Sequence, residues 1–123
     1  MSQMFSPTGA FQDPICRPVQ GSFRKFELLE DYETPEHTVK RIGVDGQPFT
    51  FDLSVPRILY AITPPMGPWL AAMCVHDDMY ERAIGSKKFA DKVFKRNLKR
   101  GRVGGFLRFC MYHSVRIGGD GAY

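Results

Sequence analysis

Apolar and polar residues alternate in three short runs between residues 23 and 55. The runs read FRKFELLE, HTVKRIGV and PFTFDLSV, and such alternation is typical of strands with one buried face. Thr34-Pro35 and Asp45-Gly46 separate the runs, and an Asp-Gly pair favours a tight hairpin turn. The pattern therefore predicts two or three antiparallel strands.

The second half of the chain carries apolar residues at helical spacing. Pro68 suits the first turn of a helix that ends before Gly85. Ser86 suits the N-cap of a second helix that ends at Gly101, and a third helix, apolar and aromatic, is predicted over residues 106–117. The predicted fold class is α+β: a small antiparallel sheet, then two antiparallel helices and a third apolar helix.

The chain length suits one domain with a single core. Residues 1–22 hold three prolines and two glycines, so we expect an extended N-terminal arm there. Residues 23–119 are expected to form the α+β domain, and residues 120–123 a C-terminal tail. No apolar run approaches the roughly 18 residues of a membrane span, and the first residues do not resemble a signal peptide. We therefore expect neither a transmembrane nor a secreted protein.

The spacing of the cysteines and of two of the histidines does not indicate a disulfide framework or a metal site. Cys16, Cys74 and Cys110 are odd in number and far apart, which fits neither a disulfide framework nor a zinc site. We expect them to be buried, reduced thiols. His37 and His113 also lack metal-ligand spacing, so we expect both to be structural.

A polar group interrupts the first predicted helix, which reads AAMCVHDDMY from residue 71. At about 100° per residue, His76 lies at the centre of the apolar face with Tyr80 beside it, and Asp77 lies at the edge of that face. Three residues of this helix are expected to point into solvent: Asp78, Glu81 and Arg82.

Asp91, on the second predicted helix, borders the face that packs inward. The short loop Gly85-Ser86 makes the two helices antiparallel neighbours. Because a buried carboxylate needs a partner, we predict a hydrogen bond between His76 and Asp91. In one interpretation the pair fixes the tautomer of His76, whose other nitrogen acts as a base toward water. In the other interpretation His76, Asp91 and Tyr80 form a polar network that holds the helices in register.

The motif H-D-x-x-Y, followed by A-D-x-x-F-x-x-x-L, resembles the two-helix core of phospholipase A2 enzymes, especially the compact bacterial, fungal and parvoviral capsid forms. The resemblance implies that His76 activates water, that Asp91 orients His76 and that Asp77 helps to bind Ca²⁺. Tyr80 would support this network. The glycine-rich loop that completes the calcium site in those enzymes, Y-x-G-x-G, has no counterpart in the sequence. Calcium prefers about six to eight oxygen ligands, so Ca²⁺ is expected only if the protein is an enzyme.

A longer set of motifs runs through the chain in the order F-D-L-S-V-P-R, P-P-M-G, H-D-x-x-Y, A-D-x-x-F and S-V-R. This order resembles the phage-associated family known as domain of unknown function 1353. Its members typically carry T-D-x-A-S-I-P-R where this chain has T-F-D-L-S-V-P-R, so the acid at Asp52 is displaced. The resemblance implies a bacteriophage or prophage origin and a location in the virion or the host cytoplasm.

Basic residues follow one broad arc of the second predicted helix, away from its apolar positions. They are Lys88, Lys92, Lys95, Arg96, Lys99 and Arg100. Such a stripe is either ordinary solvated surface or a contact for an acidic protein, for anionic lipid or, with less support, for nucleic acid.

Two functions follow from these patterns. The first is a phage structural or assembly protein, associated with the virion and in particular its tail, that keeps its His/Asp core for structure. It would bind other virion proteins through the N-terminal arm and the basic helix, and it could form oligomers. The alternative is a phage-encoded hydrolase in which the His76/Asp91 pair activates water toward an ester of host envelope lipid.

Overall fold

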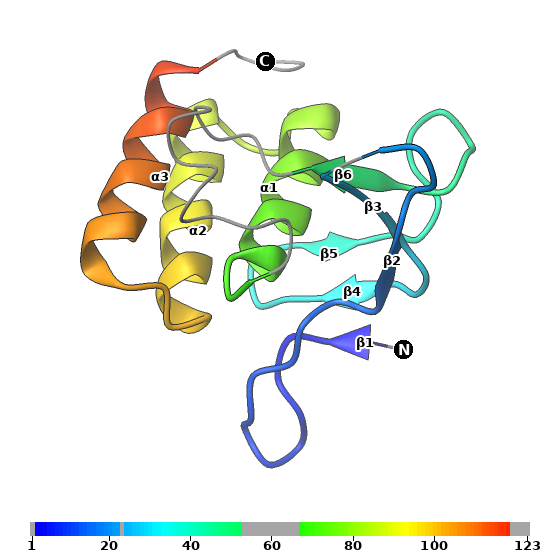
Figure 1. Cartoon of the computed structure of the whole chain (residues 1–123), viewed down its shortest axis with the longest axis horizontal. Coiled ribbons are helices and arrows are strands. Elements are labelled where there is room, and N and C mark those ends of the chain that lie inside the picture. The colour runs from blue at the N-terminus through cyan, green and yellow to red at the C-terminus, as the bar shows by residue number, and fades with distance from the viewer. Residues whose placement is uncertain (1, 23, 53–66, 119–123) are drawn as a thin grey trace.

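A computed structural model of the chain describes residues 2–22, 24–52 and 67–118. Strands come first along the chain and helices follow (Figure 1). The strands are β1 (Ser2–Gln3), β2 (Cys16–Pro18), β3 (Lys25–Leu28), β4 (Tyr32–Glu33), β5 (Thr38–Val39) and β6 (Thr50–Asp52). The helices are α1 (Leu70–Arg82), α2 (Lys87–Arg100) and α3 (Gly105–Ile117).

The strands form two small sheets, with orders β1-β4-β5 and β2-β3-β6. All pairs are antiparallel except β1 with β4, which is parallel. Alternation explains the second sheet, because Phe26 and Leu28 of β3 are buried and Phe26 lies opposite the buried Phe51 of β6. The hairpin turn expected at Asp45-Gly46 contains a left-handed Gly46, with φ of 78°. The predicted α+β class is therefore confirmed, with two small sheets in place of one.

The first 22 residues contribute β1 to one sheet and β2 to the other. Met4 is fully buried and its N–H donates to the carbonyl of Glu33. Between these strands the chain forms a loop that projects from the body of the molecule (Figure 1), closed at its base by an edge-to-face pair of Phe5 and Phe11. The segment expected to be an extended arm is thus anchored at both ends.

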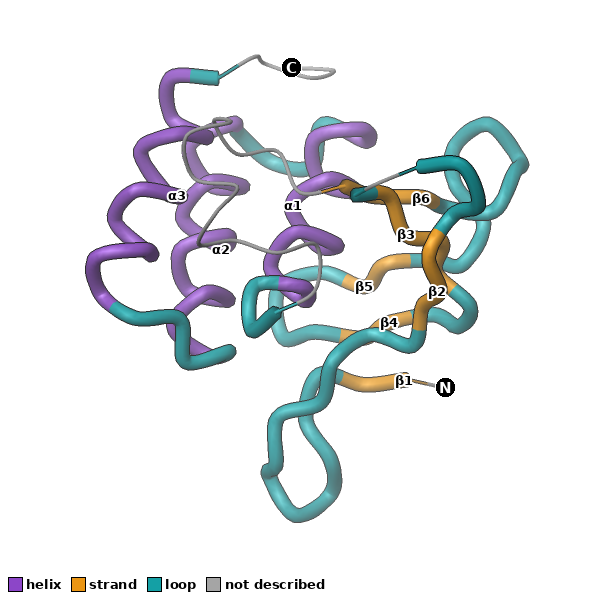
Figure 2. Tube along the Cα trace, in the orientation of Figure 1, coloured by secondary structure: helices purple, strands orange, loops and turns teal. Residues whose placement is uncertain are grey.

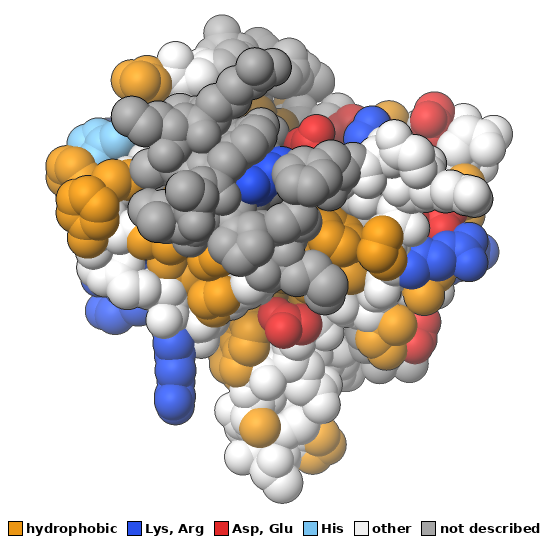
Figure 3. Space-filling model, viewed as in Figure 1, with side chains coloured by type: hydrophobic (Ala, Val, Ile, Leu, Met, Phe, Trp, Pro, Cys, Tyr) orange, Lys and Arg blue, Asp and Glu red, His pale blue; other side chains and the backbone are white. Residues whose placement is uncertain are grey.

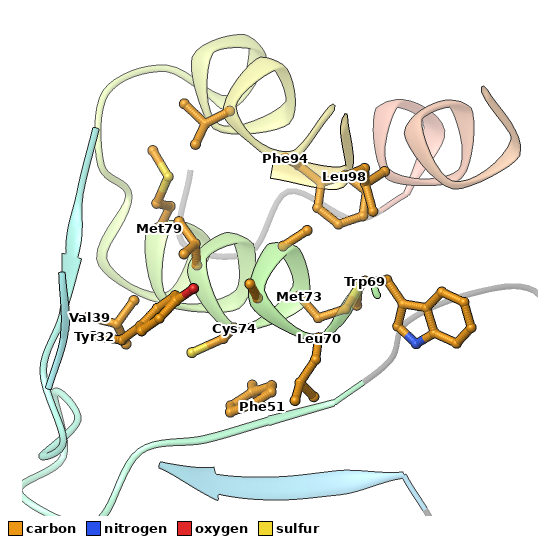
Figure 4. Close-up of a cluster of buried hydrophobic side chains, with 14 of the residues drawn as sticks. Tyr32, Val39, Phe51, Trp69, Leu70, Met73, Cys74, Met79, Phe94 and Leu98 are labelled. Carbon is orange, nitrogen blue, oxygen red and sulfur yellow. The ribbon is translucent and has the colours of Figure 1, made fainter. Parts of the chain in front are cut away.

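Helix α1 lies in the middle of the molecule, with α2 on one side and the sheets on the other (Figure 2). Figure 4 shows Phe94 and Leu98 of α2 on one side of α1, and Phe51 and Tyr32 from the strands on the other. Residues on both sides of α1 are consequently buried, including the whole run from Leu70 to His76. This double burial decides the environment of His76 and Asp78 on α1.

The helix boundaries agree closely with the sequence pattern. Ser86 caps α2 by accepting the N–H of Phe89 at 3.0 Å, as predicted. α1 ends earlier than expected, because Ala83 already adopts the left-handed conformation with φ of 51°, two residues before the left-handed Gly85. Gly101 follows α2, and a Cβ on it would lie 2.3 Å from the carbonyl oxygen of Pro68. Close packing against the start of α1, rather than backbone conformation, therefore requires glycine there.

Helix α3 lies where the third apolar helix was predicted, but much of its apolar surface faces outward. Met111 and Val115 are its buried residues, whereas Phe106, Phe109 and Ile117 are exposed. Cys74 is buried as expected, while the other two thiols are half-buried, and all three are free. Within the described ranges, no helix combines the length and apolar character needed to cross a bilayer.

Candidate functional site

The histidine of α1 and the aspartate of α2 meet between the two antiparallel helices. Nε2 of His76 lies 2.9 Å from Oδ1 of Asp91, which confirms the predicted hydrogen bond. The hydroxyl of Tyr80, one turn after His76, donates to the same oxygen. His76 and Asp91 are both buried, so the pair lies inside the helix interface.

The second oxygen of Asp91 binds two cations that the sequence analysis did not assign to the site. Nζ of Lys87 lies 3.1 Å from Oδ2, and Nη1 of Arg116 on α3 lies 2.8 Å from it. Lys87 also donates to the carbonyls of Val115 and Arg116 at 3.0 and 3.1 Å. Asp91 therefore joins all three helices, and we call Asp91, His76, Tyr80, Lys87 and Arg116 the Asp91 network.

Asp91 is ionised within this network. Burial alone would raise the pKa of its carboxyl, but the hydrogen bonds from His76, Tyr80, Lys87 and Arg116 outweigh burial and hold the pKa well below its usual range. A carboxylate has about four lone-pair positions, and four donors occupy them here. The acceptor capacity of Asp91 is consequently used up inside the protein.

His76 is enclosed by aromatic rings. Its ring centroid lies 4.1 Å from that of Tyr80 and 4.7 Å from that of Phe94. Because Asp91 accepts, Nε2 carries the hydrogen, and Nδ1 is left with a lone pair in the neutral ring. No described residue bonds Nδ1, and the His76 residue is 5% exposed. The imidazole of His76 is thus largely enclosed at the helix interface.

Asp77 faces the sheet and not the Asp91 network. Its Oδ2 accepts the backbone N–H of Asp52 on β6 at 2.9 Å. Burial raises the pKa of Asp77 to about 8, and the nearby Asp52 carboxylate adds to the effect. Among the residues that the structure describes, no three His, Cys, Asp or Glu side chains group as metal ligands. The segment 53–66, which precedes α1, lies outside the described residues.

The prediction that Asp78 points into solvent is wrong. Its carboxylate is fully buried, with Oδ2 2.6 Å from Nε2 of His37 and Oδ1 3.0 Å from Nε of Arg82. The helical wheel assumed one solvated face on α1, whereas the sheets cover that face. Arg82 is therefore half-buried instead of solvated, while Glu81 is exposed as predicted. His37, predicted to be structural, holds the segment before β5 against α1.

Two of the predicted basic-face residues are engaged within the chain. Arg100 binds Glu36 through two nitrogens at 2.6 and 2.7 Å, and Arg96 binds the same carboxylate at 2.8 Å. The hydrogen bond from Arg100 is the main reason that the pKa of Glu36 falls to about 2; partial burial opposes the shift and Arg96 adds to it. The remaining members are exposed: Lys88, Lys92, Lys95 and Lys99.

The fold and the site together define a small α+β protein with a buried His/Asp network at the junction of three helices. A family model described as "Protein of unknown function (DUF1353)" matches residues 26–115, which is well over half of the chain. The chain belongs to that family. A comparison with curated proteins found no match, and a comparison with solved structures found none either.

Proposed function

We propose that the protein is a bacteriophage structural or assembly protein, associated with the virion and in particular its tail, in which the Asp91 network serves stability. The phage assignment rests on the order of motifs through the chain. The non-enzymatic assignment rests on one observation: Asp91 is bound by four donors from three helices.

That observation bears on function because of what a catalytic carboxylate does. In a His/Asp pair that activates water, the carboxylate stabilises the positive charge that the imidazole gains. Lys87 and Arg116 already place two positive charges on Asp91. The same contacts tie the end of α3 to the start of α2 through Lys87. Asp91 is therefore better suited to joining helices than to supporting proton transfer.

Neighbouring virion proteins are the proposed partners, and the loop between β1 and β2 is the proposed contact. It projects from the domain (Figure 1), where Ser6 is half-buried and Gly9 is exposed. The loop is ordered from within, since the N–H of Ala10 bonds the side chain of Ser6 and Phe5 packs on Phe11. An ordered projecting loop loses little entropy on binding, which favours a specific protein contact.

The test is the copy number of the protein in purified particles of the phage that encodes it, measured by quantitative mass spectrometry. A structural component should be present at a fixed number of copies per particle. Absence from purified particles, with the protein abundant in the infected cell, would contradict the proposal.

A hydrolase is the second candidate, favoured by the bonding of His76. Because Nε2 donates to Asp91 and Nδ1 carries a lone pair, the imidazole has the tautomer that a water-activating base needs. In this scheme Nδ1 of His76 takes a proton from water while the hydroxide attacks an ester carbonyl of envelope lipid, and Asp91 orients the ring. The acyl C–O bond then breaks, and the alcohol leaves with the proton that Nδ1 returns. Asp77 would assist only if Ca²⁺ binds. Activity that depends on His76 would support this function.

A further inference from the structure

The outer side of α2 and α3 carries charge of a single sign. α2 and α3 contain nine lysines and arginines, and four of them bind Asp91 or Glu36. The five that no carboxylate of the described residues binds are Lys88, Lys92, Lys95, Lys99 and Arg108. Lys92, Lys95 and Lys99 are exposed and recur at helical spacing along α2. This side of the molecule is therefore strongly attractive to a polyanion.

An apolar stripe runs along α3 beside these cations. Phe106, Phe109 and Ile117 are 76%, 60% and 87% exposed. At about 100° per residue they lie within roughly 80° of one another, on the face of α3 opposite the buried Met111 and Val115. Exposed apolar stripes of this kind mark interaction sites on protein surfaces.

The cations and the apolar stripe adjoin each other. Lys95 and Arg108 line one hollow together with Phe109, Tyr112 and His113, and Nζ of Lys95 lies 5.0 Å from the centroid of the Tyr112 ring. A second hollow continues along α2 and is lined by Lys92, Lys95, Arg96, Lys99, Arg108 and Tyr112. Figure 3 shows hydrophobic side chains and a histidine gathered over α3, with basic side chains projecting below them.

We propose that this α2–α3 face, made of the exposed lysines of α2 and the apolar stripe of α3, docks on the surface of an anionic phospholipid bilayer. Lysines beside exposed phenylalanines are the composition of helices that lie in a membrane interface. The lysines contact anionic headgroups, and Phe106, Phe109 and Ile117 enter the boundary with the acyl chains. A single-stranded nucleic acid would use the cations and rings but would leave the aliphatic Ile117 without a role. The inference goes beyond the proposed function and does not depend on it.

Sedimentation with lipid vesicles tests the docking. The full chain is mixed with vesicles of phosphatidylcholine alone or of phosphatidylcholine with phosphatidylglycerol, at low and at raised salt. We expect binding to the anionic vesicles, weakened by salt. Lys95→Gln with Lys99→Gln should weaken binding roughly 25-fold, at about fivefold per lysine removed. Phe106→Ser with Phe109→Ser should weaken it by about tenfold or more while leaving the net charge unchanged.

Matched controls distinguish the contribution of the α2–α3 face to binding from the effects of net charge and of general hydrophobicity. Lys25→Gln with Lys40→Gln removes the same charge from the strand half and should change binding about twofold at most. Val44→Ser removes a side chain that is 54% exposed in the hairpin turn and should have no effect. Circular dichroism checks that each variant is folded.

Three results would overturn the proposal. The first is equal binding, or none, to neutral and anionic vesicles at low salt. The second is an equal loss of binding in the two lysine pairs, which would make net charge the cause. The third is tight binding of a single-stranded oligonucleotide in the same buffer with no vesicle binding, which would assign the face to nucleic acid.

Discussion

At the scale of single residues, the site depends on how many donors each buried carboxylate receives. Asp91 accepts from a histidine, a tyrosine, a lysine and an arginine, and Asp78 accepts from a histidine and an arginine. Asp77 receives a backbone N–H. Burial therefore has opposite outcomes: the pKa of Asp91 is lowered, whereas the pKa of Asp77 is raised.

Asp91→Asn should destabilise the protein by about 3 kcal/mol, because Lys87 and Arg116 lose the carboxylate that balances their charge. This loss is at the low end for a broken buried pair, since both cations keep some contact with water. The free energy of unfolding in urea measures the effect. Asp31→Asn removes a more exposed carboxylate paired with Lys40 at 3.7 Å and should change stability by less than about 0.5 kcal/mol. Equal effects of the two substitutions would contradict the network.

Asp77 should make stability depend on pH. Its pKa is about 8 in the folded protein, against 3.8 as the ordinary value, so the folded state holds a proton that the unfolded chain releases. Stability should therefore fall as pH rises from about 4 to about 8, by roughly 1 kcal/mol for this partly buried group. The side chain in Asp77→Asn keeps an oxygen that can accept the Asp52 N–H, but it cannot ionise. The variant should therefore be more stable than the wild type at pH 8. The free energy of unfolding in urea is measured at several pH values for both proteins. The same dependence on pH in the wild type and in Asp77→Asn would contradict this prediction.

Sequence reasoning reached part of this chemistry. The His76–Asp91 contact followed from two helical wheels and a short loop. Lys87 could have been added, because it lies four residues before Asp91 on the same helix. Arg116 could not, since its contact depends on how α3 packs, which no local pattern specifies.

At the scale of elements, local signals predicted both ends of α2, missed the end of α1 and failed for short strands. Ser86 acts through adjacent backbone, so its position in the sequence was sufficient. Gly101 stands at the predicted end of α2, but its close approach to Pro68 could not be seen in the local pattern. β1, β4 and β5 are two residues long, which is too short for alternation to be recognised. Asp78 was misplaced for a different reason: one helix sequence cannot show that its second face is covered by strands from elsewhere in the chain.

The cap of α2 is open to a direct test. Ser86→Ala removes the acceptor for the N–H of Phe89 and should cost about 1 kcal/mol of stability. Ser86→Asp restores an acceptor and places a negative charge at a helix start that has no acidic residue in its first turn. We therefore expect Ser86→Asp to be at least as stable as the wild type in thermal unfolding. An Ala variant as stable as the wild type would show that the side-chain cap contributes nothing.

Glu36 should link the β4–β5 hairpin to α2. Glu36→Gln removes the charge that binds Arg96 and Arg100 and should destabilise the protein by about 1 kcal/mol near neutral pH, since Arg96 is largely solvated. The pKa of Glu36 is about 2 when folded and 4.5 ordinarily, so its contribution is complete above about pH 4.5 and is lost as pH falls toward 2. Amide hydrogen exchange should show faster opening of the hairpin in the variant than in the wild type. A Glu33→Gln control should leave that exchange unchanged.

At the scale of the whole molecule, α1 joins two halves that use their polar groups differently. Toward α2 it presents His76 and Tyr80 to the Asp91 network, and toward the sheets it presents Asp77 and Asp78. Every one of these groups is bonded within the chain. The projecting loop and the α2–α3 face are the surfaces that we propose for binding partners.

The most direct test of the proposed non-enzymatic role is hydrolysis of phospholipid vesicles by the wild type and by His76→Ala, with and without calcium. We predict that the wild type releases no more fatty acid than His76→Ala under either condition, because the network is committed to holding the helices together. Hydrolysis by the wild type that is lost in a folded His76→Ala variant would contradict the account and establish the hydrolase instead.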